Sequence, residues 1–378
     1  MKVVVAIDSF KGSLTSVEAG EAVKKGIENV YSDAQVIVKP LADGGEGTVD
    51  ALVQGLDGRY EYIDVTGPVG RKVKSKYGIV EDKLAIIEMS EAAGITLVDE
   101  SERNPYYTTT YGVGEIIKDA IKKGCREFIV GIGGSATNDG GLGMLQALGY
   151  SISDKNGKDI LFGAIGMKEI HSITDEKVIP ELKDCTFKIA CDVNNPLYGE
   201  NGASHIYGPQ KGATPEMVKD MDTWMRQYEK VSKIYNKNAD ASEPGTGAAG
   251  GMGFAFRTFM DSSLESGIKI ILNKTAIEED IKDSDIVITG EGKLDAQTAM
   301  GKAPIGVTDI AGKYNKKVIA FSGAIGDGTE ILNEKGIDAY FPIIRRIESL
   351  DKAMEKENAK SNMEKTSEQV FRLIKTFE

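Results

Sequence analysis

The sequence predicts an α/β protein of two domains, in which strands of open parallel sheets end in ligand-binding loops. The chain has 378 residues, and at roughly 150 residues per domain this length corresponds to about two or three domains. Hydrophobic residues make up 41% of the chain, enough for sizeable cores. Its 44 glycines gather in clusters that follow apolar runs. Apolar run, glycine loop and helical pattern alternate, as they do in α/β folds.

The first β-α-β unit lies at the N-terminus. Residues 3–7 form a β-branched run that is typical of a strand buried on both faces. Thr15 and Glu18 have the spacing of a capping box, so we expect a helix to begin there. A second strand is expected at 36–38, and the right-handed crossover rule makes the two strands parallel.

The C-terminal part also alternates predicted strands with helices. Strands are expected at 285–289, 317–322 and 339–343, with a helix near 304–314 and a charged helical tail after about residue 349. Both ends of the chain therefore consist of short α/β units, and ligands of open α/β sheets bind at the carboxyl ends of the strands.

The middle of the chain has a different pattern. A hairpin is expected from 73–79 and 84–89, followed by a helix at 109–123 and a strand at 127–132. Further along, a strand is expected at 188–191 and a polar helix at 215–235.

We therefore expect two α/β domains with a discontinuous arrangement. A Rossmann- or flavodoxin-like domain is predicted from residues 1–66 and 283–378 together. A central α/β domain, residues 67–282, is predicted to be inserted into it.

Composition excludes several kinds of partner and site. A net charge of −12 disfavours nucleic acid and anionic lipid. No apolar run approaches the roughly 18 residues of a membrane span, and the N-terminus does not resemble a signal peptide. Three cysteines without a CxxC motif predict neither disulfides nor a zinc site, and two histidines weaken any triad mechanism. We expect a cytoplasmic protein that is a monomer or a homodimer.

Six polar or glycine-rich segments are candidates for chemistry: 8–15, 40–48, 131–143, 191–199, 244–253 and 289–298. A carboxylate at a strand end can coordinate a metal or orient a hydroxyl, and a lysine can meet a carboxylate or a phosphate. Glycine-rich backbone at a helix start exposes N–H groups to anions. Each segment also has a purely structural interpretation, as a turn, a helix cap or a surface ion-pair loop.

The glycine loop at 131–143 allows two functional interpretations. It follows an apolar strand and precedes a helix expected near Leu142, an arrangement that binds phosphate. Residues 131–136 also fit the dinucleotide fingerprint GxGxxA, and Asp154 lies where a ribose-binding acid is expected. An NAD(P)-dependent dehydrogenase is therefore an alternative, although the glycines at 140–143 delay the helix. A binding module without turnover is a third hypothesis.

The segment 289–298 favours phosphoryl transfer. Glu291, Lys293 and Asp295 follow a predicted strand closely and combine a cation with carboxylates for a metal or a base. The Walker A motif and the protein-kinase motifs are absent from the sequence, so a phosphate-handling enzyme would belong to another lineage.

In six ordered motifs the chain resembles the bacterial glycerate kinases of the type I class. The motifs are Asp-Ser-Phe-Lys-Gly-Ser at 8–13, Pro-Leu-Ala-Asp-Gly-Gly-Glu-Gly-Thr at 40–48, Gly-Gly-Ser-Ala-Thr-Asn-Asp-Gly-Gly at 133–141, Cys-Asp-Val-x-Asn-Pro-Leu-x-Gly at 191–199, Pro-Gly-x-Gly-Ala-Ala-Gly-Gly-x-Gly at 244–253 and Thr-Gly-Glu-Gly-x-x-Asp-x-Gln-Thr at 289–298. The resemblance implies a two-domain enzyme, with its active site in a cleft, that phosphorylates D-glycerate with ATP and Mg²⁺. It favours the 2-hydroxyl and the product 2-phospho-D-glycerate, with the 3-phospho product as the alternative.

Catalytic and metal roles are assigned on this basis. Asp192 and Asp295 are candidates for the base or for Mg²⁺ ligands, because without a histidine a carboxylate must accept the hydroxyl proton. Glu291 is a further Mg²⁺ ligand candidate. Lys11 and Lys293 are expected to meet the transferring phosphoryl group or the glycerate carboxylate. A carboxylate near Mg²⁺ and lysine stays ionised, so this mechanism requires no large pKa shift.

Binding roles complete the predicted site. Glycerate is expected to contact Asp8, Ser9, Asp43, Glu46 and Arg71. The phosphates of ATP are expected to contact Gly133, Gly134, Ser135, Thr137, Asn138 and Asp139.

Overall fold

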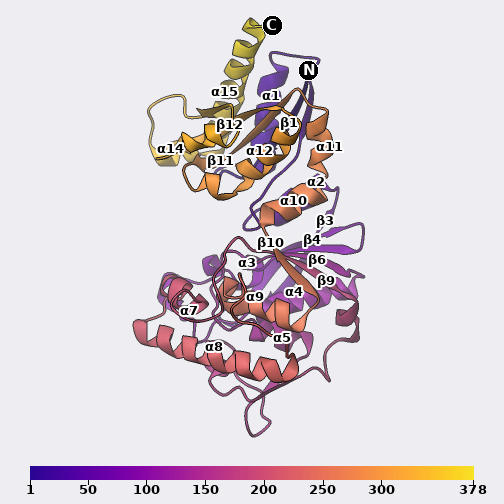
Figure 1. Cartoon of the computed structure of the whole chain (residues 1–378), viewed down its shortest axis with the longest axis vertical. Coiled ribbons are helices and arrows are strands. Elements are labelled where there is room, and N and C mark those ends of the chain that lie inside the picture. The colour runs from indigo at the N-terminus through magenta and orange to yellow at the C-terminus, as the bar shows by residue number, and fades with distance from the viewer. The chain divides into compact units, whose positions relative to one another are not determined.

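The computed structural model describes every residue from Met1 to Glu378, and the chain separates into two compact units (Figure 1). Unit 1 contains residues 1–43, 50–56 and 268–378, and unit 2 contains residues 44–49 and 57–267. These boundaries differ from the predicted ones at 66/67 and 282/283. The first shifts because β3 (Arg59–Thr66) pairs within the sheet of unit 2. The second shifts because α10 (Gly267–Lys274) and α11 (Ile277–Lys282) fall almost entirely in unit 1.

Unit 1 is built on a five-stranded sheet in the order β13-β12-β11-β1-β2. Its strands are β1 (Lys2–Ile7), β2 (Gln35–Val38), β11 (Ile286–Leu294), β12 (Lys317–Ile325) and β13 (Ala339–Pro342). All neighbouring strands are parallel, which confirms the predicted pairing of β1 with β2. Numbered within the unit, this is the flavodoxin-like order 2-1-3-4-5, whose direction switches between β1 and β11.

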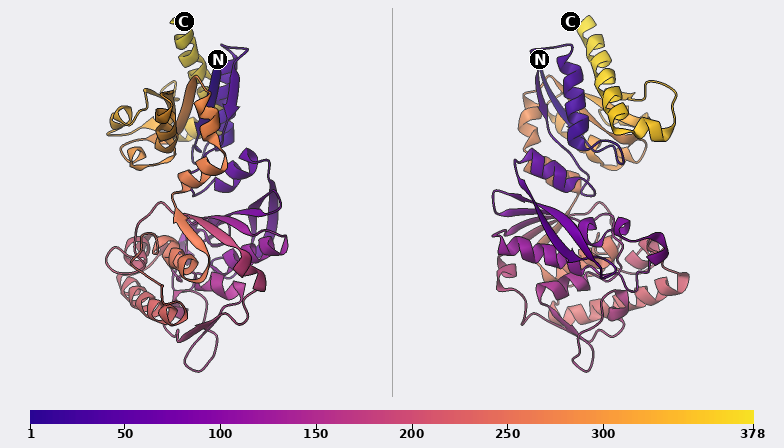
Figure 2. Two further views of the ribbon diagram at one scale, coloured as in Figure 1. Left: turned by 45° about the vertical axis from the view of Figure 1, so that its right-hand side comes forward. Right: turned by 180° about the vertical axis from the view of Figure 1, so that it is seen from behind.

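Helices cover both faces of this sheet. On one face α1 (Ser16–Glu28) and α15 (Lys356–Thr376) lie side by side, as the right-hand view of Figure 2 shows. The predicted capping box is present, since the Glu18 N–H donates to Thr15 Oγ1 and the Thr15 N–H donates to the Glu18 carboxylate. The other face is covered by α12 (Ala303–Lys313). Shorter helices of the unit are α2 (Thr48–Gly55), α13 (Ile331–Glu334) and α14 (Leu350–Met354).

Unit 2 contains a six-stranded mixed sheet in the order β10-β9-β6-β5-β4-β3. Its other strands are β4 (Lys72–Val80), β5 (Leu84–Glu88), β6 (Glu127–Gly131), β9 (Thr186–Ala190) and β10 (Ser262–Glu265). From β5 to β10 neighbouring strands are parallel, whereas β3, β4 and β5 form an antiparallel meander. The predicted hairpin of β4 and β5 is therefore confirmed, while β3 and β10 were not predicted. A separate two-stranded sheet pairs β7 (Ser151–Ser153) with β8 (Ser172–Thr174).

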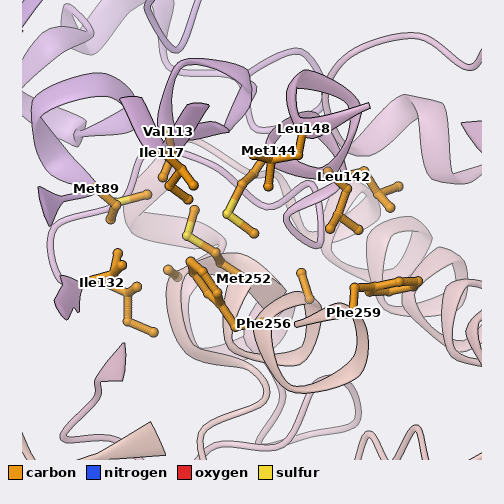
Figure 3. Packing of buried hydrophobic residues seen from close by; sticks show 14 of the residues in the cluster. Met89, Val113, Ile117, Ile132, Leu142, Met144, Leu148, Met252, Phe256 and Phe259 are labelled. Carbon is orange, nitrogen blue, oxygen red and sulfur yellow. The ribbon is translucent and has the colours of Figure 1, made fainter. Parts of the chain in front are cut away.

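The core of unit 2 lies between the large sheet and its helices. These are α3 (Ser90–Ala93), α4 (Tyr111–Lys122), α5 (Leu142–Leu148), α6 (Ala164–Met167), α7 (Ala203–Tyr207), α8 (Pro215–Tyr235) and α9 (Ala248–Phe259). Figure 3 shows Met252 of α9 close to the apolar side chains of α4, which include Val113 and Ile117. The bounds of α8 agree with the predicted helix at 215–235. None of the helices in either unit has the length and apolar character needed to cross a membrane.

Candidate active site

A pocket of about 380 Å³ in unit 1 lies at the carboxyl ends of β1, β11 and β12. Its lining includes the segment 8–11 after β1, residues 291–293 of β11 and residues 323–324 of β12. Ligands of open parallel sheets bind where the strand order reverses, which in this unit is between β1 and β11. The position of the pocket is therefore the one that the topology favours for a ligand.

Asp8 is the buried carboxylate of this pocket. It follows β1 directly, and its N–H donates to Gly290 O at 2.9 Å, which continues the ladder with β11. The side chain of Asp8 is 3% exposed, and its Oδ1 accepts a hydrogen bond of 2.6 Å from the Ser9 N–H. Burial, and then the charge of Asp43, raise the pKa of Asp8 to about 7. The sequence-based mechanism requires no large pKa shift, and Asp8 nevertheless has one.

Glu291 and Lys293 reach the pocket from β11. This strand is longer than the predicted 285–289, because its pairing with β12 continues through the glycine-containing segment as far as Leu294. Alternate residues of a strand point to the same face, so these two side chains share one face of β11. Glu291 is largely buried, accepts a hydrogen bond of 2.5 Å from Thr298 Oγ1, and has its pKa raised by burial.

Three lysines line the same pocket: Lys11, Lys293 and Lys302. Lys11 Nζ lies 3.4 Å from Asp43 Oδ2, and Lys302 Nζ lies 3.9 Å from a carboxylate oxygen of Glu291. Lys302 was not among the predicted site residues, although it follows the motif at 289–298 closely enough to have been considered.

Asp295 stands beside the pocket and is held by Lys293. Lys293 Nζ lies 3.0 Å from Asp295 Oδ2, and this hydrogen bond lowers the pKa of Asp295. The remaining predicted residues of unit 1 line the pocket itself: Asp8, Ser9, Lys11, Asp43, Glu291 and Lys293.

In unit 2 the candidates lie at the carboxyl edge of the parallel strands. The glycine loop follows β6, and Asp192 follows β9. The segment 44–49 passes close to both strand ends, since a Cβ placed on Gly131 would come within 2.4 Å of Gly44 O. Glu46 and Asp192 are exposed at this edge, and Asp192 Oδ1 accepts a hydrogen bond of 3.3 Å from the Gly267 N–H.

Only the first part of the glycine loop faces solvent. Gly133 and Gly134 are exposed, whereas Thr137, Asn138 and Asp139 are fully buried. These three side chains are shielded from solvent in this conformation, and Thr137 Oγ1 and Asn138 Oδ1 have no hydrogen-bond partner within the protein. Their contact with phosphate stays a prediction. Gly133, Gly134 and Ser135 keep their place as candidates for anion binding.

Asp139 has a structural role instead. Its carboxylate accepts hydrogen bonds from the N–H groups of Thr110, Gly141 and Gly143 and from Thr110 Oγ1. These donors lie at the starts of α4 and α5, so the single carboxylate compensates the unpaired N–H groups of two helices. The hydrogen bonds of the buried Asp139 carboxylate therefore fix the conformation of the glycine loop.

Lys211 is a buried residue of this site that the sequence analysis missed. It is 2% exposed, and its Nζ donates to Ser135 Oγ at 2.7 Å and to Thr137 O at 2.5 Å. Burial lowers the pKa of Lys211 to about 7, while the charge of Asp139 opposes the shift. Sequence offers no signal for this contact, because Lys211 is 76 positions away from Ser135.

Arg71 lies in the turn between β3 and β4 and already has a partner. Its two terminal nitrogens donate to the Glu102 carboxylate at 3.1 and 2.6 Å, and both side chains are exposed. Exposed pairs of this kind are weak, so a ligand carboxylate could compete for the guanidinium.

The dinucleotide-binding alternative does not fit the topology. A Rossmann helix begins immediately after the glycine turn, whereas α5 begins only at Leu142. Asp154 follows β7, which pairs with β8 outside the large sheet. It therefore does not end the next parallel strand, where a ribose-binding acid would stand.

A parallel sheet whose switch-point pocket gathers lysines and carboxylates defines an α/β enzyme that handles small anionic substrates. Comparison with known proteins gives the family. Residues 3–375 match the model of the glycerate kinase family. The chain belongs to the glycerate kinase family.

Individual relatives agree with this family. The chain is 46% identical over 354 residues to a glycerate 2-kinase of Escherichia coli K12, covering 93% of each chain. It is 45% identical over 375 residues to a glycerate kinase of Haemophilus influenzae, covering 99% of each. A crystal structure from Salmonella typhimurium LT2, provisionally named glycerate kinase 2, superimposes with a TM-score of 0.91 at 42% identity, covering 100% of this chain and 98% of the other.

Proposed function

We propose that this protein transfers the γ-phosphoryl group of ATP to the 2-hydroxyl of D-glycerate, forming 2-phospho-D-glycerate and ADP. Family membership and the names of the relatives support glycerate phosphorylation. The structural observation that carries the proposal is the unit 1 pocket, where Asp8, with a pKa of about 7, shares the lining with three lysines. The 3-hydroxyl is the alternative site of transfer.

Asp8 is our candidate for the group that accepts the hydroxyl proton. A general base works best when its pKa lies near the operating pH, and the buried Asp8 meets this condition. Asp295 was one of two predicted candidates for the base or a Mg²⁺ ligand, but the hydrogen bond from Lys293 stabilises its ionised form and makes it a weaker proton acceptor. Asp192 remains a second candidate, from unit 2.

The cations of the pocket are proposed to carry the charge of the reacting groups. Phosphoryl transfer depends mainly on positioning and on neutralising charge at the transferred group. Lys11, Lys293 and Lys302 are suited to this role, because their ammonium groups line the pocket that contains Asp8. Ser9 and Asp43 of the same pocket are proposed to hold the glycerate hydroxyls.

Unit 2 is proposed to contribute anion-binding and polar groups. The backbone N–H groups of the exposed Gly133 and Gly134, and of the adjoining Ser135, suit a phosphate or a carboxylate. Glu46 and Arg71 are retained as proposed glycerate contacts.

Mg²⁺ is part of the same proposal. Proteins commonly bind this ion through one or two carboxylates together with substrate phosphates. No group of three or more His, Cys, Asp or Glu side chains is arranged to hold a metal ion. Glu291 would hold the ion, with Asp295 and Asp192 as the other candidates. Bound Mg²⁺ would neutralise phosphate charge.

We also propose that the protein works in the cytoplasm, as a monomer or a homodimer. The three free thiols support a reducing compartment.

The test is a coupled assay of ADP formation with D-glycerate, L-glycerate, glycolate and lactate, each with and without Mg²⁺. We expect ADP formation that requires both D-glycerate and Mg²⁺. Proton-coupled phosphorus NMR then identifies the product, because a 2-phosphate couples to one carbon-bound proton and a 3-phosphate to two. An inactive protein with every acid would contradict the proposed function.

A further inference from the structure

We infer that the unit 1 pocket is the binding site of the purine nucleotide, with the base on an apolar side and the phosphates beside the lysines. The nucleotide's identity rests on the proposed function, but its location does not. The apolar side, called here the apolar wall, is formed by Ile343, Ile344, Leu350, Ala353 and Met354. This location differs from the sequence-based assignment of ATP to the loop at 133–141.

The lining of the pocket divides into two chemically different parts. Lysines and carboxylates come from β11, from the segments after β1 and β2, and from Lys302 at the start of α12. The apolar wall comes from the chain after β13 and from α14. A three-carbon hydroxy acid has almost no apolar surface to place against such a wall. A purine ring has two apolar faces and a phosphate chain attached through the sugar, so a nucleotide matches both parts.

Folding of unit 1 accounts for Ile343, which is buried in the core, but not for the exposed part of the apolar wall. Leu350 is 71% exposed and Ile344 is 42% exposed. Burying apolar surface is favourable by about 25 cal/mol per Å², so exposed apolar side chains lining a pocket offer binding energy to a ligand. Their place in the pocket lining distinguishes them from single exposed apolar residues elsewhere on the surface.

The apolar wall adjoins the phosphate end through α14. A Cβ placed on Gly12 would come within 2.9 Å of Met354 Cε, so Met354 contacts the loop that carries Lys11. One ligand can therefore touch both parts of the lining.

A hydroxyl without a partner points to an anionic ligand at the lysine end. Ser13 Oγ is buried, lines the pocket and has no hydrogen-bond partner within the protein. Buried polar groups are almost always paired, so an unpaired hydroxyl in the lining that also contains Lys11 suits a bound phosphate oxygen. The carboxylates at this end require a cation with the phosphates, which is the role proposed for Mg²⁺.

Gly292 leaves the floor of the pocket open. Its backbone lies outside the positive-φ region, and a Cβ there would be 3.5 Å from Phe10 Cα, an ordinary contact. Neither conformation nor packing therefore explains the glycine. A larger side chain at position 292 would extend next to Phe10 and Lys11, both of which line the pocket.

Calorimetry with ADP and with inorganic pyrophosphate, both with Mg²⁺, tests the inference. The double variant Ile344→Ser/Leu350→Ser removes exposed side chains, so its fold should be unaffected. We expect its Kd for ADP to rise about tenfold or more, with its Kd for pyrophosphate unchanged. Leu373→Ser is the matched control, since Leu373 is 54% exposed on α15 outside the pocket lining and its loss should leave both constants unchanged.

A blocking variant provides an independent test. Gly292→Val places a β-branched side chain on a strand that tolerates it, so we expect an unchanged melting temperature and a Kd for ADP raised at least about tenfold. ADP affinity at the wild-type value in both the double variant and Gly292→Val would overturn the inference.

Steady-state kinetics separate this inference from the proposed function. In the double variant we expect a higher KM for ATP and a KM for D-glycerate within twofold of the wild type. A raised KM for D-glycerate with unchanged ADP binding would place the acid, instead of the base, against the apolar wall and overturn the inference. A wild-type protein that forms no ADP from D-glycerate, but shows the calorimetric pattern above, would refute the proposed function and support the nucleotide site.

Discussion

At the scale of single residues, the candidate site is held by buried charges. Asp8 is buried among other carboxylates, so its ionised form is penalised, and its pKa is about 7 in the folded protein against 3.8 for an ordinary aspartate. Because the folded-state pKa is the higher one, Asp8 favours folding below about pH 4. That contribution is lost as the pH rises through 7. Stability is therefore lowered at the pH where Asp8 could act as a base.

The Asp8→Asn variant is expected to be more stable than the wild type at pH 8. The substitution keeps the shape of the side chain and removes the buried charge, so the free energy of unfolding should rise by roughly 1–4 kcal/mol. The gain should shrink as the pH is lowered toward 4. Urea unfolding at pH 8 and at pH 5 measures both values, and a variant less stable than the wild type at pH 8 would contradict the account.

Lys211 is expected to be essential for the stability of the glycine loop. Its removal leaves Ser135 Oγ and Thr137 O without their donor and Asp139 without a nearby cation. Lys211→Ala should therefore lower the free energy of unfolding by about 3 kcal/mol. Lys155→Ala, at an exposed lysine of the same unit, should change it by no more than about 0.5 kcal/mol. Equal urea midpoints for the two variants would show that the buried contact is not stabilising.

At the scale of secondary structure elements, α1 and α15 approach closely at Gly26. A Cβ at this position would lie 2.1 Å from Ser367 Oγ and 2.4 Å from Glu364 O. Glycine here is explained by packing between the two helices, since its φ lies in the ordinary helical range.

Gly26→Ala is expected to destabilise the protein by about 1–3 kcal/mol, because the helices must separate to accommodate the methyl group. Gly312→Ala in α12 is the matched control, since no atom lies within 4 Å of its Cβ position. There the substitution should stabilise the protein by about 0.5–1 kcal/mol through its helix propensity. Melting temperatures measure both changes, and shifts of the same sign would contradict this explanation.

Elements with local signals were predictable from the sequence. The capping box of α1 and the periodicity of α8 depend on nearby residues alone, and both helices lie where they were expected. The extension of β11 was not predictable in this way, because Gly290 and Gly292 indicate a loop while the pairing with β12 maintains a strand. β3 had a usable signal, the alternation from Tyr60 to Val65, which was not recognised as a strand.

The candidate site was predictable in its motifs more than in its geometry. Six residues assigned from unit 1 motifs line one pocket. Sequence cannot tell which side chains of a motif face inward, so Asn138 and Asp139 were assigned to a ligand although they are buried. It also cannot pair Lys211 with Ser135, because only the tertiary fold brings them together.

At the scale of the whole molecule, the family match extends over both units. Residues 3–375 match the family model, and unit 1 combines both ends of the chain. The chain carries a net charge of −12, yet three lysines line the one pocket at the topological switch point. This local concentration of cations suits anionic substrates on an acidic protein.

The most direct test of the account is the kcat of Asp8→Asn in the D-glycerate-dependent formation of ADP, measured beside Asp295→Asn. The account predicts that Asp8→Asn lowers kcat at least about 100-fold while it still binds ADP, because proton transfer to a positioned base contributes roughly that factor or more. Asp295→Asn should have the smaller effect on kcat. A wild-type kcat in Asp8→Asn would contradict the assignment of Asp8 as the proton acceptor.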